Sequence, residues 1–72
     1  MKIPNESTVN FVRNNYPEGT RVELVYMDDI QAPPVGTKGT VLYVDDMADI
    51  GVEWDNGSCL AAVYGIDYVR RV

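Results

Sequence analysis

A chain of 72 residues, 46% of them hydrophobic, has room for one small folded domain and little else. One cysteine and no histidine exclude an intramolecular disulfide, a zinc finger, and a Ser-His-Asp or Cys-His catalytic site. Six Lys and Arg against 11 Asp and Glu give a net charge of −5, opposite in sign to a typical nucleic-acid-binding domain.

A short amphipathic helix is predicted near the N-terminal end. Asn5 or Ser7 can cap it, because a side-chain oxygen there accepts a free backbone N–H. Val9, Val12 and Tyr16 follow at spacings of three and four, so they share one face. A helix this short is not stable alone. Its apolar face must therefore pack on the rest of the chain or on a partner.

Five short strands are predicted after the helix. The first has Val22, Leu24 and Tyr26 on one face, alternating with polar residues. The strands are expected at residues 21–27, 40–44, 50–55, 58–63 and 68–72. Asn56-Gly57, between the third and fourth strands, is the dipeptide preferred by a two-residue type I′ hairpin.

This pattern predicts a mainly β fold, a small five-stranded barrel with a short N-terminal α-helix. Strong curling lets about ten inward side chains meet and protects the sheet edges. The predicted core consists of apolar residues at inward positions: Val22, Leu24, Val41, Val44, Ile50, Val52, Trp54, Leu60, Ala62, Ile66 and Val69. Val41 and Val44 differ in parity, so the second strand needs a bulge if both face inward. We expect residues 1–17 to form the helix and linker and residues 18–72 the barrel, within one domain.

Nearly the whole chain resembles a known family of small domains. The matching segments are Tyr16-Pro17-x-Gly19-Thr20-Arg21-Val22, Met27-Asp28-Asp29, Ala32-Pro33-Pro34-x-Gly36-Thr37-x-Gly39-Thr40-Val41, Val44-Asp45-Asp46, Val52-x-Trp54-Asp55-Asn56-Gly57-Ser58, Leu60 and Gly65-x-Asp67. In these segments the chain is similar to a family of unknown function found in Gram-positive bacteria, their phages and mobile elements. The resemblance implies an SH3-like barrel and a role in mobile-element biology, and it implies no particular activity.

A candidate binding groove follows from this fold. In SH3-like barrels the long loop after the first strand lies near the turn before the last strand. Aromatic faces and carboxylates there would hold a basic or proline-containing peptide. The candidate groove residues are Tyr26, Asp28, Asp29, Pro33, Pro34, Tyr64 and Tyr68. The alternative is that the aspartates shape the loop through Asx turns while the tyrosines cover the core.

The remaining chemistry-bearing residues favour structural roles. Asp28, Asp29, Asp45, Asp46 and Asp49 lie on two loops without the ligand spacing of an EF-hand, so we expect solvated turns with no bound metal or cofactor.

Trp54 shares a face with Ile50 and Val52 and is expected in the core. Cys59 has no histidine to activate it, so we expect no catalytic residue and no enzyme activity. The adjacent cations Arg70 and Arg71 point to opposite strand faces, so we expect no nucleic-acid binding.

We therefore expect a non-catalytic protein-interaction module of a bacterial or mobile-element system, a monomer or weak dimer with an unidentified protein partner. No apolar run approaches the roughly 20 residues that span a bilayer, and the first residues do not resemble a signal peptide, so we expect no membrane contact and a cytoplasmic location. One alternative is an acidic antagonist of a host defence or nuclease complex, which requires one acidic face. Another is an enzyme that uses Asp28 and Asp29 inside a dry pocket.

Overall fold

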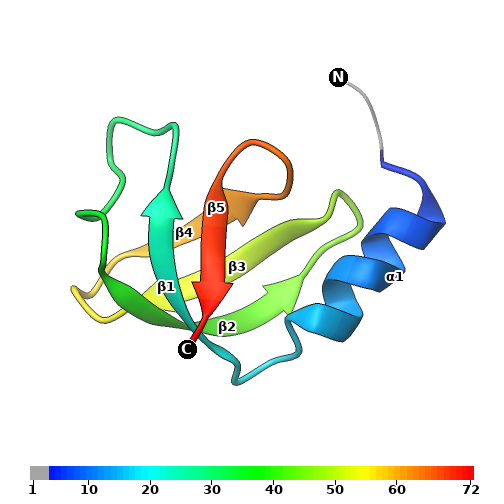
Figure 1. Ribbon diagram of the computed structural model, residues 1–72, viewed down its shortest axis with the longest axis horizontal. Helices are drawn as coiled ribbons and strands as arrows, with labels where there is room; N and C mark the ends of the chain where they lie inside the picture. Colours follow the sequence, from blue (N-terminus) through cyan, green and yellow to red (C-terminus); the bar gives the residue numbers. More distant parts are fainter. Residues whose placement is uncertain (1–3) are drawn as a thin grey trace.

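The computed structural model describes residues 4–72, in which five antiparallel strands form one curled sheet and a single helix packs beside it (Figure 1). The elements are α1 (Glu6–Asn15), β1 (Arg21–Tyr26), β2 (Lys38–Val44), β3 (Asp49–Trp54), β4 (Cys59–Val63) and β5 (Tyr68–Arg71). The strand order is β4-β3-β2-β1-β5. The predicted fold class is confirmed, and this arrangement is consistent with an SH3-like barrel. The predicted segment 1–17 begins with three residues that lie outside the described part.

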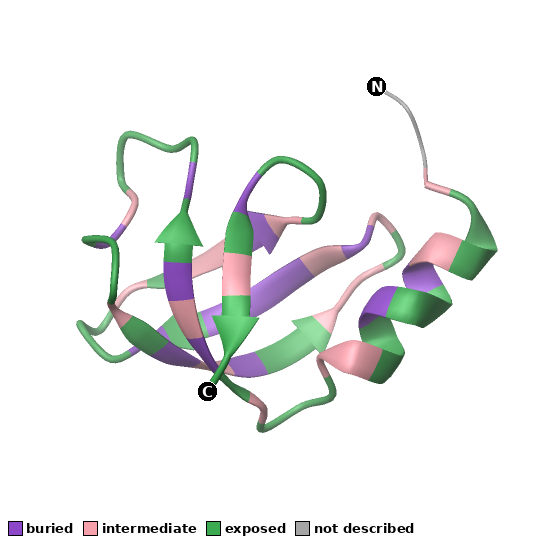
Figure 2. Ribbon diagram, viewed as in Figure 1, coloured by how far each residue is buried: buried purple, intermediate pink, exposed green. Residues whose placement is uncertain are grey.

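The helix packs on its own chain. Asn5 caps it, because its Oδ1 accepts the N–H of Thr8 at 2.8 Å. Val9 and Val12 are buried on the side that faces the sheet (Figure 2). Arg13 links the helix to the end of β2 and the loop that follows. Its Nε donates to the Val44 carbonyl at 3.2 Å, and its Nη2 forms a salt bridge with Asp46 at 2.8 Å. Within residues 4–72, no helix has the length and apolar character that crossing a bilayer requires.

The second strand contains the bulge that the parity of its valines requires. Its pairing with β3 shifts register between Val41 and Tyr43. Val41 is fully buried, and Val44 packs against the core from a partly exposed position. One extra residue in β2 therefore lets both valines face the same side.

The hairpin between β3 and β4 differs from the predicted type I′ turn. Gly57 has a φ of 94°, but Asn56 is not among the residues with positive φ. The Gly57 N–H donates to the Trp54 carbonyl at 2.9 Å, and the Trp54 N–H donates to the Ser58 carbonyl at 2.8 Å. These bonds describe a three-residue loop in which a tight turn precedes a left-handed glycine. The Asn56 side chain stabilises this form, because its Oδ1 accepts the N–H of Ser58.

Most of the predicted core is confirmed, with one error. The buried hydrophobic residues are Val9, Val12, Val22, Leu24, Met27, Val41, Ala48, Ile50, Val52, Trp54 and Ala62. Val44, Leu60 and Val69 pack against them from partly exposed positions. Ile66 was predicted in the core but is 55% exposed. The turn before β5, with Gly65 at a φ of 91°, sends Ile66 outward and brings Asp67 inward.

Candidate functional site

Asp67 joins the two ends of the curled sheet. It is the one buried polar or charged residue within the described chain. Its Oδ1 accepts the N–H of Asp28 at 2.8 Å, and its Oδ2 accepts the N–H of Val63 at 2.8 Å. The carboxylate thus ties the residues after β1 to the end of β4. These two hydrogen bonds explain why the loop after β1 lies near the turn before β5, as the sequence predicts.

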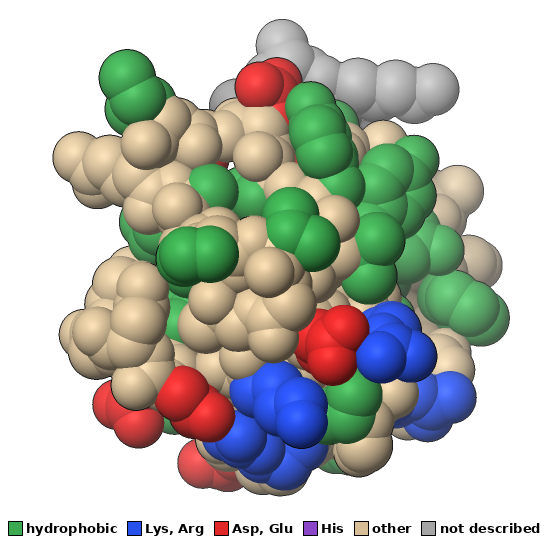
Figure 3. Space-filling view, turned by 60° about the vertical axis from the view of Figure 1, so that its left-hand side comes forward, with side chains coloured by type: hydrophobic (Ala, Val, Ile, Leu, Met, Phe, Trp, Pro, Cys, Tyr) green, Lys and Arg blue, Asp and Glu red, His purple; other side chains and the backbone are tan. Residues whose placement is uncertain are grey.

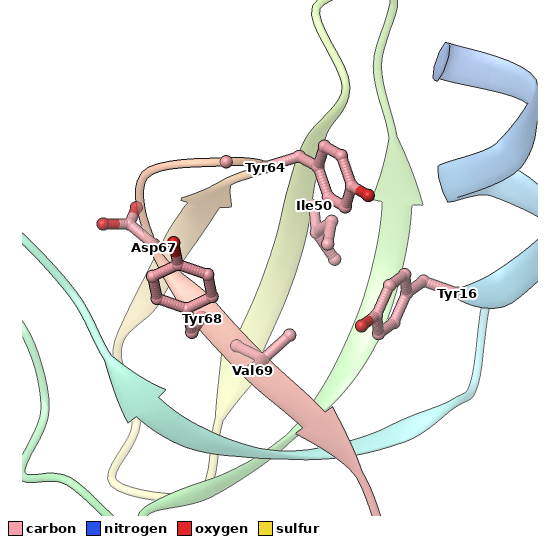
Figure 4. Close-up of a pocket in the computed structure, with 7 residues that line it drawn as sticks. Tyr16, Ile50, Tyr64, Asp67, Tyr68 and Val69 are labelled. Carbon is pink, nitrogen blue, oxygen red and sulfur yellow. The ribbon is translucent and has the colours of Figure 1, made fainter. Parts of the chain in front are cut away.

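A hollow of about 300 Å³, which we call the tyrosine pocket, lies beside this tie. It is lined by Tyr16, Ile50, Tyr64, Gly65, Asp67, Tyr68 and Val69. In Figure 4 the rings of Tyr16, Tyr64 and Tyr68 surround the hollow, and Ile50 and Val69 lie between them. The carboxylate of Asp67 points away from the hollow (Figure 4). Residues from the C-cap of α1, from β3, from the β4–β5 turn and from β5 therefore build one pocket.

A second hollow of about 560 Å³, the helix-side pocket, opens on the other side of Tyr64. It is lined by Pro4, Thr8, Met47, Ala48, Asp49, Val63, Tyr64 and Ile66. Tyr64 contributes to both pockets, and among residues 4–72 Asp49 is the only charged residue that lines the helix-side pocket. The two hollows and the turn between β4 and β5 thus form one continuous region of the surface.

Large apolar side chains are exposed around this turn. We call them the aromatic surface: Phe11, Tyr26, Tyr64, Ile66 and Tyr68. The rings of Phe11 and Tyr64 meet edge to face with centroids 6.4 Å apart, and those of Tyr26 and Tyr68 lie at the same distance, tilted by 47°. Exposed hydrophobic side chains that cluster beside concave sites are typical of binding surfaces.

The structure brings together part of the predicted groove. Tyr26 and Tyr68 contact each other, and Tyr64 and Tyr68 share the tyrosine pocket. Asp28 and Asp29 have exposed side chains near the Asp67 tie. Neither lines one of the two pockets.

The two prolines are placed differently from each other. Pro33 is buried and Pro34 is exposed, and neither lines the two pockets. The loop after β1 thus approaches the site only where the Asp28 N–H contacts Asp67, and its prolines lie outside both pockets.

The acidic loops have internal structural roles. Asp29 Oδ1 accepts the N–H of Gln31, and Asp45 Oδ1 accepts the N–H groups of Met47 and Asp49. These are the Asx turns expected as the alternative reading of the aspartates. Within residues 4–72, no three Asp, Glu or Cys side chains converge in a group that could hold a metal ion.

Negative charge accumulates near the two pockets. The pKa of Asp49 is raised, first by burial and then by the charges of Asp45 and Asp67. No Lys or Arg among residues 4–72 lines either pocket. The three salt bridges of this part of the chain, Arg13–Asp46, Arg21–Asp55 and Arg70–Glu23, involve none of these three acids. The region therefore favours cations over anions.

Comparison with known protein families assigns the chain to one of them. Residues 5–72 match the family described as a domain of unknown function, DUF4314. The chain belongs to the DUF4314 family. The DUF4314 match extends over α1 and all five strands, so the helix that walls one side of the pockets is part of the family's domain. No curated protein and no solved structure is similar enough to the chain to count as a match.

Sequence reasoning missed several pocket residues for identifiable reasons. Tyr16 was assigned to the apolar face of the helix, yet it is the C-cap residue and faces the hollow. Ile50 and Val69 were assigned to the core, where they also form the floor of the pocket. Spacing along the sequence finds these residues but not the pocket, because its walls come from the end of α1, β3, the β4–β5 turn and β5, which only the curled sheet brings together.

Proposed function

We propose that this DUF4314 domain is a non-catalytic protein-interaction module that binds an extended segment of a partner protein. The observation that carries the proposal is the aromatic surface. Tyr64, Ile66 and Tyr68 are 43%, 55% and 57% exposed, and they stand between two hollows. Side chains of a partner segment can enter the hollows while its backbone crosses the turn.

The pockets favour recognition over chemistry. Their walls are mainly aromatic and aliphatic, and the chain has no histidine to act as a general base near neutral pH. A partner from a bacterial or mobile-element system fits the family resemblance found in the sequence. We include that setting in the proposal.

An acidic antagonist that imitates nucleic acid is the second candidate, and it needs a single acidic face. In the view of Figure 3, acidic and basic side chains alternate at the lower end and hydrophobic side chains occupy much of the middle. Three of the 11 acids are paired with arginine. The remaining ones are distributed over the helix, the loops and β3. Because the acids do not gather on a single face, the antagonist has less support. The aromatic surface supports the interaction module more strongly.

Selection from a displayed library of random peptides tests the proposal. The full chain is the bait, and the binding constants of selected peptides are measured by isothermal titration calorimetry. We expect Tyr64→Ala and Tyr68→Ala each to weaken binding by about tenfold or more, since buried aromatic anchors dominate such interfaces. An Asp28→Ala/Asp29→Ala double variant measures whether the loop after β1 contributes.

The matched control is Leu42→Ala, which removes an exposed apolar side chain of β2 outside both pockets. We expect its affinity to equal that of the unchanged chain. Failure to select any peptide, or equal binding by the Tyr64, Tyr68 and Leu42 variants, would overturn the proposal.

A further inference from the structure

The tyrosine pocket has the dimensions of a site for one side chain. Its volume of about 300 Å³ lies at the lower limit of ligand pockets, which hold about 300 to 1,000 Å³. Ile50, which is 2% exposed, closes the floor together with Val69. The rings of Tyr16, Tyr64 and Tyr68 form the walls (Figure 4). An elongated side chain can therefore place its end among three aromatic rings.

Each of the three walls is held by a separate contact. Tyr16, the C-cap of α1, has its N–H bonded to the Val12 carbonyl at 2.9 Å and packs, partly buried, against the core. Phe11 supports Tyr64 edge to face, and Tyr26 lies against Tyr68. A pocket assembled before binding loses less entropy when a ligand enters.

The electrostatics of the pocket select the charge of its occupant. Asp67 is buried and accepts two backbone N–H groups, and no salt bridge within residues 4–72 involves it. Its carboxylate points away from the hollow, but its negative charge lies beside the pocket, and no Lys or Arg among residues 4–72 lines the pocket. The faces of the tyrosine rings add further negative potential, because an aromatic quadrupole is negative above and below the ring. Both effects attract a cation and repel an anion.

We propose that the tyrosine pocket is a cation site that holds the ammonium or guanidinium end of a Lys or Arg side chain from the partner protein. This inference rests on the proposed interaction function and specifies what the partner must supply. The apolar stem of that side chain lies on Ile50 and Val69, and its charged end faces the three rings.

Small probes test the pocket without knowledge of the partner. The full chain is titrated with n-butylammonium, n-butylguanidinium, 1-butanol and butyrate, and the ring ¹H–¹³C signals of Tyr16, Tyr64 and Tyr68 are followed by NMR. We expect both cations to shift all three sets of signals saturably, with dissociation constants in the millimolar range of a single side chain. We expect 1-butanol to bind at least about fivefold more weakly and butyrate to leave the signals unchanged. The tighter of the two cations identifies lysine or arginine as the preferred side chain.

Two variants assign the effect to the rings. Tyr64→Leu and Tyr68→Leu keep an apolar side chain but remove the aromatic face, and each should weaken cation binding by about two- to fivefold. Tyr43→Leu is the matched control, because Tyr43 is also exposed but lines neither pocket. Its cation affinity should stay that of the unchanged chain.

Equal binding of butanol and the cations, or no shift with either cation, overturns the cation site. Selected peptides that still depend on Tyr64 and Tyr68 would then show that the interaction function holds while its proposed ligand is wrong. The probe series on the unchanged chain decides the question even if a variant fails to fold.

Discussion

At the scale of single residues, Asp67 holds the site together. Asp67→Asn keeps one acceptor oxygen but turns an amide NH₂ toward one of the two backbone N–H donors. Because one donor is left without an acceptor, we expect the free energy of unfolding to fall by about 1–3 kcal/mol. Urea denaturation at neutral pH measures this change.

The control for this prediction is Asp28→Asn. The side chain of Asp28 is exposed, and only its backbone N–H contacts Asp67. A surface substitution of this kind should change stability by no more than about 0.5 kcal/mol. Equal effects of the two variants would show that the carboxylate of Asp67 does not close the sheet.

Asp49 should make stability depend on pH. Its pKa is raised by burial and by the charges of Asp45 and Asp67, so it binds a proton more tightly in the folded chain than in the unfolded chain. The free energy of unfolding therefore falls as the pH rises through the interval between the unfolded and folded pKa values. We expect Asp49→Asn to raise the melting temperature at pH 7, and this gain to disappear below about pH 4, where an unfolded aspartate is also protonated.

Glu18→Gln serves as its control, because it removes the same charge from an exposed position. Its effect should be smaller at pH 7. If Asp49→Asn leaves the melting temperature at pH 7 unchanged, the ionised Asp49 carboxylate does not destabilise the folded chain, which would contradict this prediction.

The roles of individual residues were predictable from sequence only where they are local. The Asx turns of Asp29 and Asp45 follow from the short reach of the side chain to a nearby N–H. The burial of Trp54 follows from strand alternation. Asp67 accepts the N–H of a residue 39 positions away, and no sequence pattern specifies that pairing.

At the scale of elements, two glycines set how closely β2 and β3 pack. A Cβ on Gly39 would lie 2.6 Å from Val52 Cγ1 and 2.8 Å from the carbonyl oxygen of Glu53. The three atoms nearest a Cβ on Gly51 all belong to the ring of Tyr43, which is half exposed and can move aside. We expect Gly39→Ala to lower the free energy of unfolding by about 1–3 kcal/mol, and Gly51→Ala to cost less.

Thermal or urea unfolding of both variants measures the difference. If Gly51→Ala costs as much as Gly39→Ala or more, then Tyr43 is held on Gly51 more firmly than its exposure implies. That result would contradict the prediction that the close backbone contact makes Gly39→Ala the more destabilising substitution.

The positions of the elements could be predicted, because alternation and turn residues act over short distances. Each strand lies within two residues of its predicted bounds. The hairpin type could not be predicted, since Asn-Gly suits both a two-residue loop and a three-residue loop that places Gly57 in the left-handed region. The docking of α1 was left open, because Val9 and Val12 form an apolar face that fits this sheet or a partner equally well.

At the scale of the whole molecule, the curl of the sheet creates the candidate site. It brings the end of α1, the start of β3, the β4–β5 turn and the start of β5 around one hollow. The sequence predicts the mainly β class, and the family match extends over residues 5–72. The pocket itself depends on long-range closure through Asp67, so spacing along the chain does not reveal it.

The central claim is that this surface binds a segment of a partner protein. The most direct measurement is an NMR titration of the full chain with the tightest peptide from the displayed library, followed through backbone amide signals. The account predicts the largest shifts at Tyr16, Ile50 and residues 64–69, with little change at Leu42 and Cys59 on other parts of the sheet. The largest shifts at Leu42 and Cys59, with the signals of residues 64–69 unmoved, would contradict it.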